Sequence, residues 1–501
     1  MLTWLIIIPV IACLLIGFLR TPGRATALVS AALTLVLGIA AFVVSPEQGA
    51  SSPCLSSFLG CDTQFALLSP MSSALLLLTV IVTFAAVLGM RAPSAEAERS
   101  WSISALLISA GAMGAFTSDN VLAFYAFHEL ALIPTFVMIG YYGRGERRTI
   151  AWRATIYLGV ASMVLLAGLA MLCFQMRSLS FMKMYDLVRA GNVPASPCVL
   201  GGLLLVGFGT LVSLFPFHSW AAPAYASAPT PVAMLHAGVL KKFGLYGLFV
   251  IGLVFAPVVY SIFGCWVNLL LVLLVCNVLW VGYVTISQSR LDNMLGNSSV
   301  MHMGYLFLAF AAFVGCGGEN MLAVQGATIL MVAHGLSIAM LFLLCGQVES
   351  QTGTLEMHAL GGLAQKLPRL GFLFGLAGMA SIGLPLLANF AGEFTVFMSC
   401  FLGWAPGAAP TLCATGEGCC LLSTISGWFG GLGPVQLAAV FAVWGLVISA
   451  VYMLRAFRRI FVGGVSPASD RATHLTCADT LSAALLAGAL LLFGIAPFLL
   501  I

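Results

Sequence analysis

Residues 211–231 read LVSLFPFHSWAAPAYASAPTP, and residues 232–247 continue as a second apolar stretch, VAMLHAGVLKKFGLYG. Four prolines interrupt the first stretch: Pro216, Pro223, Pro229 and Pro231. Proline lacks a backbone N–H and clashes with the preceding helical turn, so a helix breaks or kinks where it occurs. The stretch therefore predicts a membrane helix that is interrupted part-way across the bilayer.

A second apolar segment is interrupted in a similar way. Residues 381–394 read SIGLPLLANFAGEF, with Gly383, Pro385, Asn389 and Gly392 inside the run. Counted along the chain, the interrupted segments are the seventh and the twelfth helices. Broken helices at corresponding positions of two halves are typical of inverted-repeat transporters. An ordinary proline kink, common in membrane helices, is the alternative, and the spacing favours the repeat.

The composition excludes several classes of protein. Of the 501 residues, 61% are apolar and 7% are charged, whereas soluble domains carry about 25% charged residues. A water-soluble domain and a disordered chain are therefore excluded. The 20 Lys and Arg residues and the net charge of +4 are too few for a nucleic-acid surface, so we expect no nucleic-acid partner.

Long apolar runs follow one another along the whole chain. They fall near 2–19, 25–44, 65–90, 101–118, 120–141, 152–175, 197–215, 231–257, 260–286, 298–315, 320–346, 370–401, 434–458 and 478–501. A helix needs about 20 apolar residues to span a bilayer, whereas a membrane β-barrel needs short segments of alternating polarity. The runs do not alternate. We therefore predict an all-α polytopic membrane protein of about 14 transmembrane helices.

Basic residues indicate the orientation in the membrane. Loops after odd-numbered helices hold Arg20, Arg24, Arg91, Arg99, Arg144, Arg147, Arg148, Arg290, Lys366, Arg369, Arg455, Arg458, Arg459 and Arg471. Among the loops after even-numbered helices, 45–64 and 402–433 hold no Lys or Arg. The segment after helix six is the exception, with Arg177, Lys183 and Arg189. Because Lys and Arg collect in cytoplasmic loops, both termini are predicted on the non-cytoplasmic side.

Cysteines collect in or beside the predicted outer loops. They are Cys54, Cys61, Cys198, Cys316, Cys413, Cys419 and Cys420. An oxidising compartment would permit a Cys54–Cys61 bridge and another within 413–420, although these cysteines are equally interpreted as tolerated small residues. No metal, iron–sulfur or nucleotide motif is visible, so we expect neither metal nor cofactor in this chain.

Ionisable residues fall inside the predicted spans. They are Glu129 in helix five, Lys241 and Lys242 in helix eight, His302 in helix ten, His334 in helix eleven and Glu393 in helix twelve. A charge at the bilayer centre costs at least about 2.5–3.5 kcal/mol, so such groups are presumed functional and inward-facing. Together they provide groups that can gain and lose protons at mid-depth in the membrane, as a proton pathway requires. A single buried histidine is nevertheless more often a packed, hydrogen-bonded residue. Adjacent Lys241 and Lys242 are about 100° apart around the helix, so we expect one of them to face the interior.

Several strings resemble a known family when taken in order. They are FHELALIP (127–134), PFHSWAAPAYASAPT (216–230), AGVLKKFGLYG (237–247), SSVMHMGY (298–305), VAHGLSIAMLFLLCGQ (332–347) and LPLLANFAGEF (384–394). They are similar to the antiporter-like membrane subunits of respiratory complex I, relatives of Mrp-type antiporters, and closest to the subunit M (chain 4) branch. The resemblance covers about residues 100 to 460.

The resemblance implies fourteen helices with two inverted five-helix repeats, helices 4–8 and 9–13, in which helices 7 and 12 are broken. The implied divisions are an N-terminal three-helix segment (1–100), the first repeat (101–257), the second repeat (258–460) and a C-terminal helix (461–501). It also implies a proton pathway along the middle of the membrane through Glu129, Lys242, His302, His334 and Glu393. Possible accessory residues are Lys241, His236 and His218, of which His236 falls where the subunit L branch has a histidine.

The sequence departs from the family at three motifs. Family members carry a lysine in helix seven that pairs with the helix-five glutamate, and its position here is Leu211. WLPDA reads WAAPA at 220–224, without its acid, and QTDxK reads QSRLD at 288–292, with acid and base exchanged. We expect the exchange to keep a local ion pair.

The missing lysine bears on the mechanism. An ion pair at about 4 Å is worth about 4 kcal/mol at an effective dielectric constant of 20, enough to change proton affinity substantially. Without that pair we expect Glu129 to be protonated and neutral in its apolar surroundings. Lys241 is a hypothetical substitute partner.

The leading functional prediction is a proton-translocating subunit of an NADH:quinone oxidoreductase in a bacterial inner membrane. Its expected partners are L-like and N-like membrane subunits and the lipid bilayer, with FMN, iron–sulfur clusters and quinone held by partner subunits. Two alternatives remain open: an Mrp-type antiporter or hydrogenase-linked membrane subunit, and a structural paralogue that does not pump.

Overall fold

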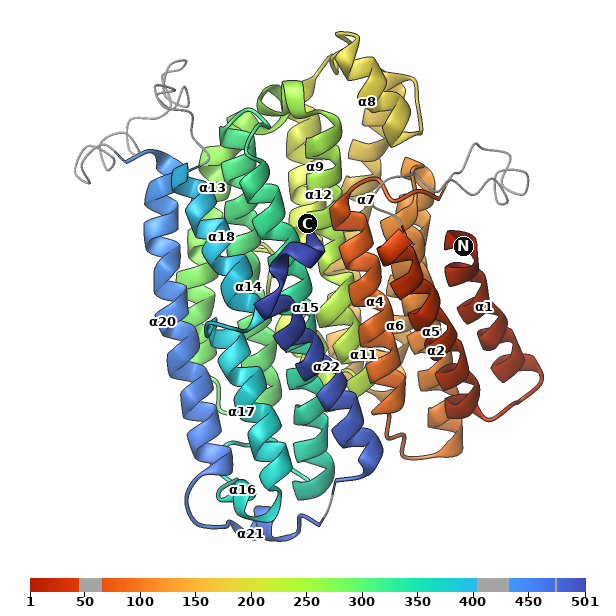
Figure 1. Ribbon diagram of the computed structural model, residues 1–501, viewed down its shortest axis with the longest axis vertical. Helices are drawn as coiled ribbons and strands as arrows, with labels where there is room; N and C mark the ends of the chain where they lie inside the picture. The colour runs from red at the N-terminus through yellow and green to blue at the C-terminus, as the bar shows by residue number, and fades with distance from the viewer. Residues whose placement is uncertain (45–64, 403–431, 474) are drawn as a thin grey trace.

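The structure, a computed structural model, describes residues 1–44, 65–402, 432–473 and 475–501. Over these ranges the chain forms a bundle of helices aligned along one axis, and it forms no β-strand beyond isolated bridges (Figure 1). Eleven helices of the described part are long and apolar enough to cross a membrane. The predicted all-α membrane fold is therefore confirmed. The count of fourteen spans, which also needs four shorter apolar helices, stays a prediction.

The bounds of the main helices follow in chain order. They are α1 (Leu2–Phe18), α2 (Gly23–Val44), α4 (Pro70–Leu88), α5 (Ala95–Thr117), α6 (Val121–Tyr142), α7 (Arg147–Met176), α9 (Pro197–Val212), α12 (Lys242–Val254), α13 (Val259–Ser287), α14 (Leu291–Gly315), α15 (Met321–Thr352), α17 (Pro368–Ile382), α18 (Ala388–Leu402), α20 (Pro434–Phe461) and α22 (Cys477–Ile495). Shorter elements are α8 (Phe181–Arg189), α10 (Ala221–Ser227), α11 (Thr230–Leu235), η2 (His236–Leu240), η3 (Ala256–Val258), α16 (Leu363–Lys366), α21 (Pro467–Asp470) and η5 (Pro497–Leu500).

The seventh predicted span is broken, as its prolines indicate. α9 ends at Val212, and the chain turns before α10 begins at Ala221. A side chain from α13 satisfies backbone groups freed by this break: the Asn277 amide accepts from the Phe215 N–H at 2.7 Å and donates to the Ser213 carbonyl at 3.4 Å. Interrupted helices are tolerated at membrane depth when neighbouring helices supply such partners.

The twelfth predicted span is also broken, between α17 and α18. Gly383 ends α17 in the left-handed region, at φ +85°, where glycine avoids the strain that a side chain would bring. Helix eight is irregular in another way, because η2 is a π-helical turn between α11 and α12. There the Lys241 N–H bonds the His236 carbonyl five residues back, at 3.0 Å. π-turns of this kind occur frequently at functional sites.

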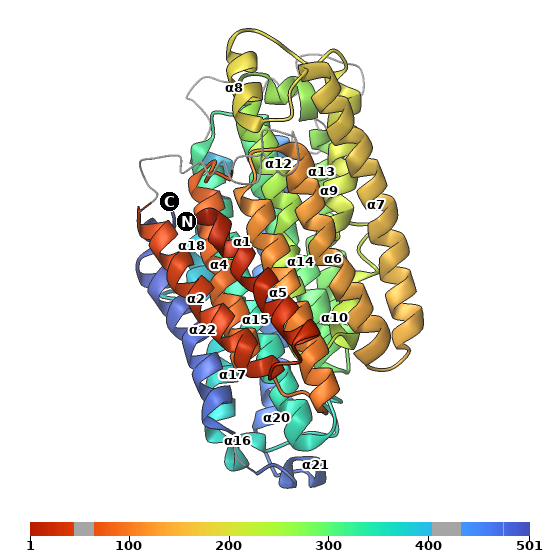
Figure 2. The same ribbon diagram turned by 90° about the vertical axis from the view of Figure 1, so that its right-hand side faces the viewer.

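The helices that carry most of the predicted site lie in the middle of the bundle. α14 and α15 occupy the centre in both views (Figures 1 and 2). The apolar windows of α14 and α15 are 94% buried and that of segment 230–254 is 89% buried, against 33% for α2 and 39% for α7. Ionisable side chains on the central helices are therefore surrounded by protein and kept from lipid.

Basic loops predicted to share one side meet at the end of the bundle that carries α16 and α21. Three ion pairs join them: Arg91 with Asp479, Arg144 with Glu349 at 2.6 Å, and Lys366 with Asp470 at 2.7 Å. Outside the membrane-spanning segments, the Lys366 ammonium holds the pKa of the Asp470 carboxyl below its usual value through a hydrogen bond and its charge. The loops thus lie together, and the two termini lie at a similar height nearer the opposite end (Figures 1 and 2).

The exchanged motif at 288–292 keeps its ion pair, as expected. The Arg290 guanidinium donates to both carboxylate oxygens of Asp292, at 3.1 and 2.7 Å, and lies 3.7 Å from Glu356. This bidentate contact raises the pKa of Arg290. Acid and base have changed places while the local pairing has been kept.

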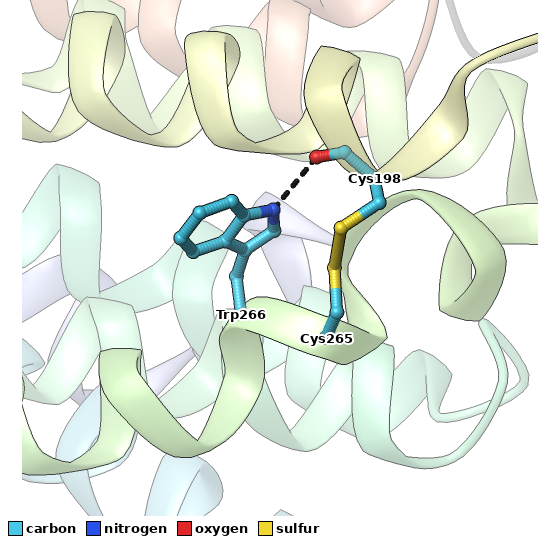
Figure 3. Close-up of a disulfide and its surroundings, with 3 residues drawn as sticks. All are labelled: Cys198, Cys265 and Trp266. Carbon is cyan, nitrogen blue, oxygen red and sulfur yellow. Dashed lines mark hydrogen bonds between the residues drawn. A yellow bond between two sulfur atoms is a disulfide. The ribbon is translucent and has the colours of Figure 1, made fainter.

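A disulfide joins Cys198, at the start of α9, to Cys265 in α13, with 6.5 Å between their Cα atoms (Figure 3). The indole N–H of Trp266 donates to the Cys198 carbonyl at 2.7 Å beside it. The sequence placed Cys198 at the outer side but assigned it no partner, because Cys265 falls inside an apolar run. The predicted bridges, Cys54–Cys61 and one within 413–420, lie outside the described residues.

Candidate functional site

Lys241 and Lys242 are both buried, with 1% and 0% of their surface exposed. The expectation that one of the two would face away from the interior is therefore wrong, because helix eight is enclosed by protein on every side. Their ammonium groups point to different partners. Lys242 Nζ donates to the Ala237 carbonyl at 2.7 Å, whereas Lys241 Nζ donates to Ser299 Oγ at 3.4 Å.

Ser299 joins Lys241 to His334. The Ser299 hydroxyl in α14 lies 3.2 Å from Nε2 of His334 in α15. The Lys241 ammonium also lies 5.3 Å from the ring centre of Tyr225, within the range of a cation–π contact. Three elements, helix eight, α14 and α15, thus bring an ammonium, a hydroxyl and an imidazole together.

His302 and Glu393 form the next part of the site. His302 Nδ1 lies 3.5 Å from Oε1 of Glu393, and its Nε2 lies 3.2 Å from the hydroxyl of Tyr452. The Tyr452 hydroxyl is also 2.6 Å from Ser298 Oγ. The ring centres of His302 and His334 are 5.3 Å apart, so the two histidines are neighbours.

The break in helix twelve makes room for the carboxylate of Glu393. A β-carbon at Gly383 would overlap Glu393 Oε2. The same glycine has the positive φ that ends α17. Gly383 therefore both interrupts the helix and leaves space for the buried acid.

Glu129 stands apart from these groups. Its side chain is 34% exposed at the outer surface of α6, where it accepts a hydrogen bond from the Ser162 hydroxyl of α7. Ser162 Oγ also lies 2.8 Å from the Tyr125 hydroxyl. The expectation that Glu129 faces inward is therefore wrong. The structure does not bring Lys241 to it as a substitute partner, because the ammonium of Lys241 lies with Ser299.

His128, next to Glu129, is the residue of this pair that faces the interior. It is buried, its ring stacks on Phe243 at a centroid distance of 3.9 Å, and Nδ1 lies 3.4 Å from Glu129 Oε1. His128 is not among the predicted site residues, although it stands in the string FHELALIP (127–134). Two adjacent polar residues in an apolar helix face directions about 100° apart. This adjacency is the sequence signal that could have indicated an inward-facing His128.

The accessory histidines occupy different surroundings. His236 is buried at the start of η2, with the rings of Trp220 and Tyr225 at 5.6 and 5.1 Å. His218 is partly exposed in the turn between α9 and α10, where its ring stacks on Phe215 at 5.4 Å. His236 thus borders the cluster around Lys241, while His218 lies at its edge.

Ser299 and Tyr452 are the further site residues that sequence reasoning missed. Both are buried and both contact a predicted histidine. Burying a hydroxyl group in a membrane costs little free energy, so neither residue is distinguished in the sequence from the other Ser and Tyr residues of the apolar runs. Among the described residues, no group of three or more His, Cys, Asp or Glu side chains is placed to hold a metal ion.

Comparison with known proteins shows the family to which this chain belongs. Residues 118–415 match the family model described as NADH:quinone oxidoreductase/Mrp antiporter, transmembrane. The chain belongs to this family of antiporter-like membrane subunits, and the resemblance inferred from its strings is confirmed.

Relatives in sequence are named NAD(P)H-quinone oxidoreductase chain 4 or NADH-quinone oxidoreductase subunit M. NAD(P)H-quinone oxidoreductase chain 4 2 of Microcystis aeruginosa is 32% identical over 359 residues, covering 72% of this chain and 59% of that protein. Chain 4 of Gloeobacter violaceus is 29% identical over 506 residues, covering 99% and 89%. NADH-quinone oxidoreductase subunit M of Rickettsia conorii is 28% identical over 391 residues, covering 78% and 71%. The match thus spans about three fifths of the length of the Microcystis relative.

Solved structures agree on the fold. A chain of respiratory complex I from Thermus thermophilus with bound NADH superposes with a TM-score of 0.81 at 25% identity, covering 99% of this chain and 96% of that one. A chain of the Mrp complex from Dietzia sp. DQ12-45-1b gives 0.79 at 17% identity, covering 100% and 95%. The second likeness concerns the fold alone.

Proposed function

We propose that this chain is a proton-translocating, subunit M-like membrane subunit of an NADH:quinone oxidoreductase. Electron transfer in partner subunits drives H⁺ movement through a mid-membrane series of ionisable groups. The observation that carries the proposal is the buried series Lys241, Ser299, His334, His302 and Glu393 on central helices.

The chemistry of this series supports proton movement. Lysine, histidine and glutamate change charge by gaining or losing a proton, and serine passes one on by donating while it accepts. Neighbouring members are joined by contacts of 3.2 to 3.5 Å, except at the two histidine rings, whose centres are 5.3 Å apart. Buried ionisable groups are costly in a membrane protein, and their collection in one place is typical of a proton pathway. The Glu129–His128 pair would serve as a separate entry point for protons, beside helix eight.

Redox chemistry belongs to partner subunits in this proposal. FMN, iron–sulfur clusters and quinone would be held there, and this chain would contact L-like and N-like membrane subunits. The relatives' names, which are those of NAD(P)H-quinone oxidoreductase subunits, support the assignment.

The orientation follows from two independent features. The basic loops lie at the α16 and α21 end, which the positive-inside rule assigns to the cytoplasm. The exposed Cys198–Cys265 disulfide lies toward the opposite end, where an oxidising compartment would preserve it. The chain would therefore lie in a bacterial inner membrane with both termini on the non-cytoplasmic side.

A cation/proton antiporter of the Mrp type, or a hydrogenase-linked subunit, is the second candidate. The family description covers both branches, and the fold is shared with an Mrp complex. A structural paralogue that does not pump is the third, favoured by the hydrophobic Leu211 at the lysine position. Purification of the complex from its native membrane separates the first two, because only complex I contains NADH-binding and quinone-binding partner subunits.

The test of proton translocation is Glu393→Gln in the assembled complex. The proton-to-electron ratio measured in sealed vesicles should fall while NADH oxidation continues, because the buried acid no longer titrates. Glu319→Gln, the same change at an exposed loop position, is the matched control. An unchanged ratio for Glu393→Gln in a fully assembled complex contradicts the proposal and favours the structural paralogue.

A further inference from the structure

We infer that Ser299 is a proton relay between Lys241 and His334, so that Lys241 is the lysine that delivers the proton to the second half of the pathway. The inference rests on the proposed function and names the route within it. Lys242 is the lysine that matches the family, whereas Lys241 is an additional one, and the structure separates what the two can do.

Hydrogen-bonding capacity sets the direction of this relay. An ammonium group has only donors, so Ser299 Oγ must accept from Lys241 at their separation of 3.4 Å. A serine has a single proton of its own, which is then free to be donated to His334 Nε2, 3.2 Å away. In the relay His334 accepts at Nε2, so the proton of its neutral imidazole is on Nδ1, a buried nitrogen with no hydrogen-bond partner among the described residues.

The transfer balances without another reactant. The Lys241 Nζ–H bond breaks as Ser299 Oγ takes up that proton, and the Ser299 O–H bond breaks as His334 Nε2 takes up the other. Lys241 becomes a neutral amine, Ser299 remains a hydroxyl, and His334 becomes an imidazolium. Loss of a proton from His334 toward the neighbouring His302, rotation of the serine hydroxyl and reprotonation of Lys241 restore the starting state.

Lys242 lacks an equivalent route. Its ammonium donates to the carbonyl of Ala237 at 2.7 Å. A backbone carbonyl accepts a hydrogen bond but has no proton to pass on. Lys242 therefore contributes a buried positive charge beside the pathway, while Lys241 contacts the residue that leads onward.

The local backbone supports this division. In the π-helical turn η2 the Lys241 N–H reaches back five residues to His236, which widens the helix directly before the two lysines. The ring of Tyr225, 5.3 Å from Lys241 Nζ, stabilises the ammonium facing α14. Beyond His334, the His302 ring follows at 5.3 Å and Glu393 follows at 3.5 Å from His302.

The experiment compares Ser299→Ala with Ser299→Thr in the assembled complex, by proton-to-electron ratio in sealed vesicles. Removal of the hydroxyl should slow proton movement through this chain about 100-fold, as loss of a positioned proton-transfer group typically does. Ser299→Thr keeps a hydroxyl and should retain the ratio. The control Ser482→Ala removes another buried serine hydroxyl, which donates to the Ala85 carbonyl away from the site, and should leave the ratio unchanged.

A double variant tests whether lysine and serine act on one route. Lys241→Met should lower the ratio as Ser299→Ala does, and the two changes together should lower it no further, because residues on one route are not additive. A wild-type ratio for Ser299→Ala overturns the inference, and so does an additive loss in the double variant.

Glu393→Gln, measured in parallel, separates this inference from the proposed function. If Glu393→Gln lowers the ratio and Ser299→Ala does not, protons pass without the serine, and only the relay is rejected. If neither variant lowers it, the proposed translocation and the relay are rejected together.

Discussion

His302 Nδ1 in α14 lies 3.5 Å from Glu393 Oε1 in α18, and both side chains are buried. An imidazole and a carboxyl at this distance exchange a proton or form an ion pair, depending on where the proton resides. The pair exists because helix twelve is broken beside it, where Gly383 leaves space for the carboxylate.

Gly383→Ala should reproduce much of the effect of Glu393→Gln. The new β-carbon would overlap the Glu393 carboxylate and would occupy φ +85°, a conformation costing about 1–3 kcal/mol for a residue other than glycine. We expect a lower proton-to-electron ratio in vesicles. Gly488→Ala in α22, where a β-carbon meets nothing within 4 Å, is the control. Equal ratios for the two variants would argue against this role of Gly383.

Asn277→Leu should destabilise the break in helix seven. It removes the acceptor for the Phe215 N–H and the donor to the Ser213 carbonyl, leaving backbone groups at the break unpaired at about 1–3 kcal/mol each. We expect a lower midpoint of thermal unfolding for the detergent-purified complex. Asn277→Asp keeps the acceptor for the Phe215 N–H and should lower this midpoint less. Equal decreases in the two variants would contradict this account.

Labelling should reveal the orientation of the disulfide. Cys198 and Cys265 are exposed, so an impermeant reductant followed by an impermeant maleimide should modify them in vesicles whose outer face is non-cytoplasmic. Cys477, exposed and free at the start of α22 near the basic loops, should instead react in inverted vesicles. Peptide mass spectrometry distinguishes the sites. Labelling of all three cysteines from one side would contradict the proposed topology.

Leu211→Lys tests the state of Glu129. The sequence predicts a protonated Glu129, because the helix-seven lysine is replaced by a buried leucine, whereas the Ser162 hydroxyl that donates to this partly exposed carboxyl favours the charged form. An infrared carboxyl band that disappears in Glu129→Gln would report the protonated acid. The lysine should convert that band to a carboxylate signal by charge pairing. A band unaffected by Leu211→Lys would show that the added lysine does not reach Glu129.

Much of the architecture could be predicted from the sequence, because its signals are local or arise from high energetic cost. Prolines and glycines marked both broken helices, since backbone geometry depends on the residue itself. His302, His334 and Glu393 could be nominated because ionisable groups in apolar runs are expensive. The structure places these three side chains next to one another, while their role as a proton pathway stays a prediction.

Other features of the site depend on which helices become neighbours. Ser299 and Tyr452 carry no costly charge, and only the packing of helix eight, α14, α15 and α20 brings their hydroxyls to the lysine and histidines. The outward position of Glu129 depends on the rotation of α6 against α7. The Cys198–Cys265 pair likewise depends on α9 meeting α13.

The sequence by itself determined that this chain is a bundle of membrane helices with two interruptions and costly ionisable residues inside. Those properties follow from apolar length, proline geometry and the free energy of burying charge. Only the tertiary structure decided that both lysines are enclosed, that Lys241 contacts Ser299, and that Glu129 lies at the surface. The physical reason is that helix rotation and neighbour choice come from packing of the whole bundle, and apolar side chains on every face leave little periodic signal to indicate them.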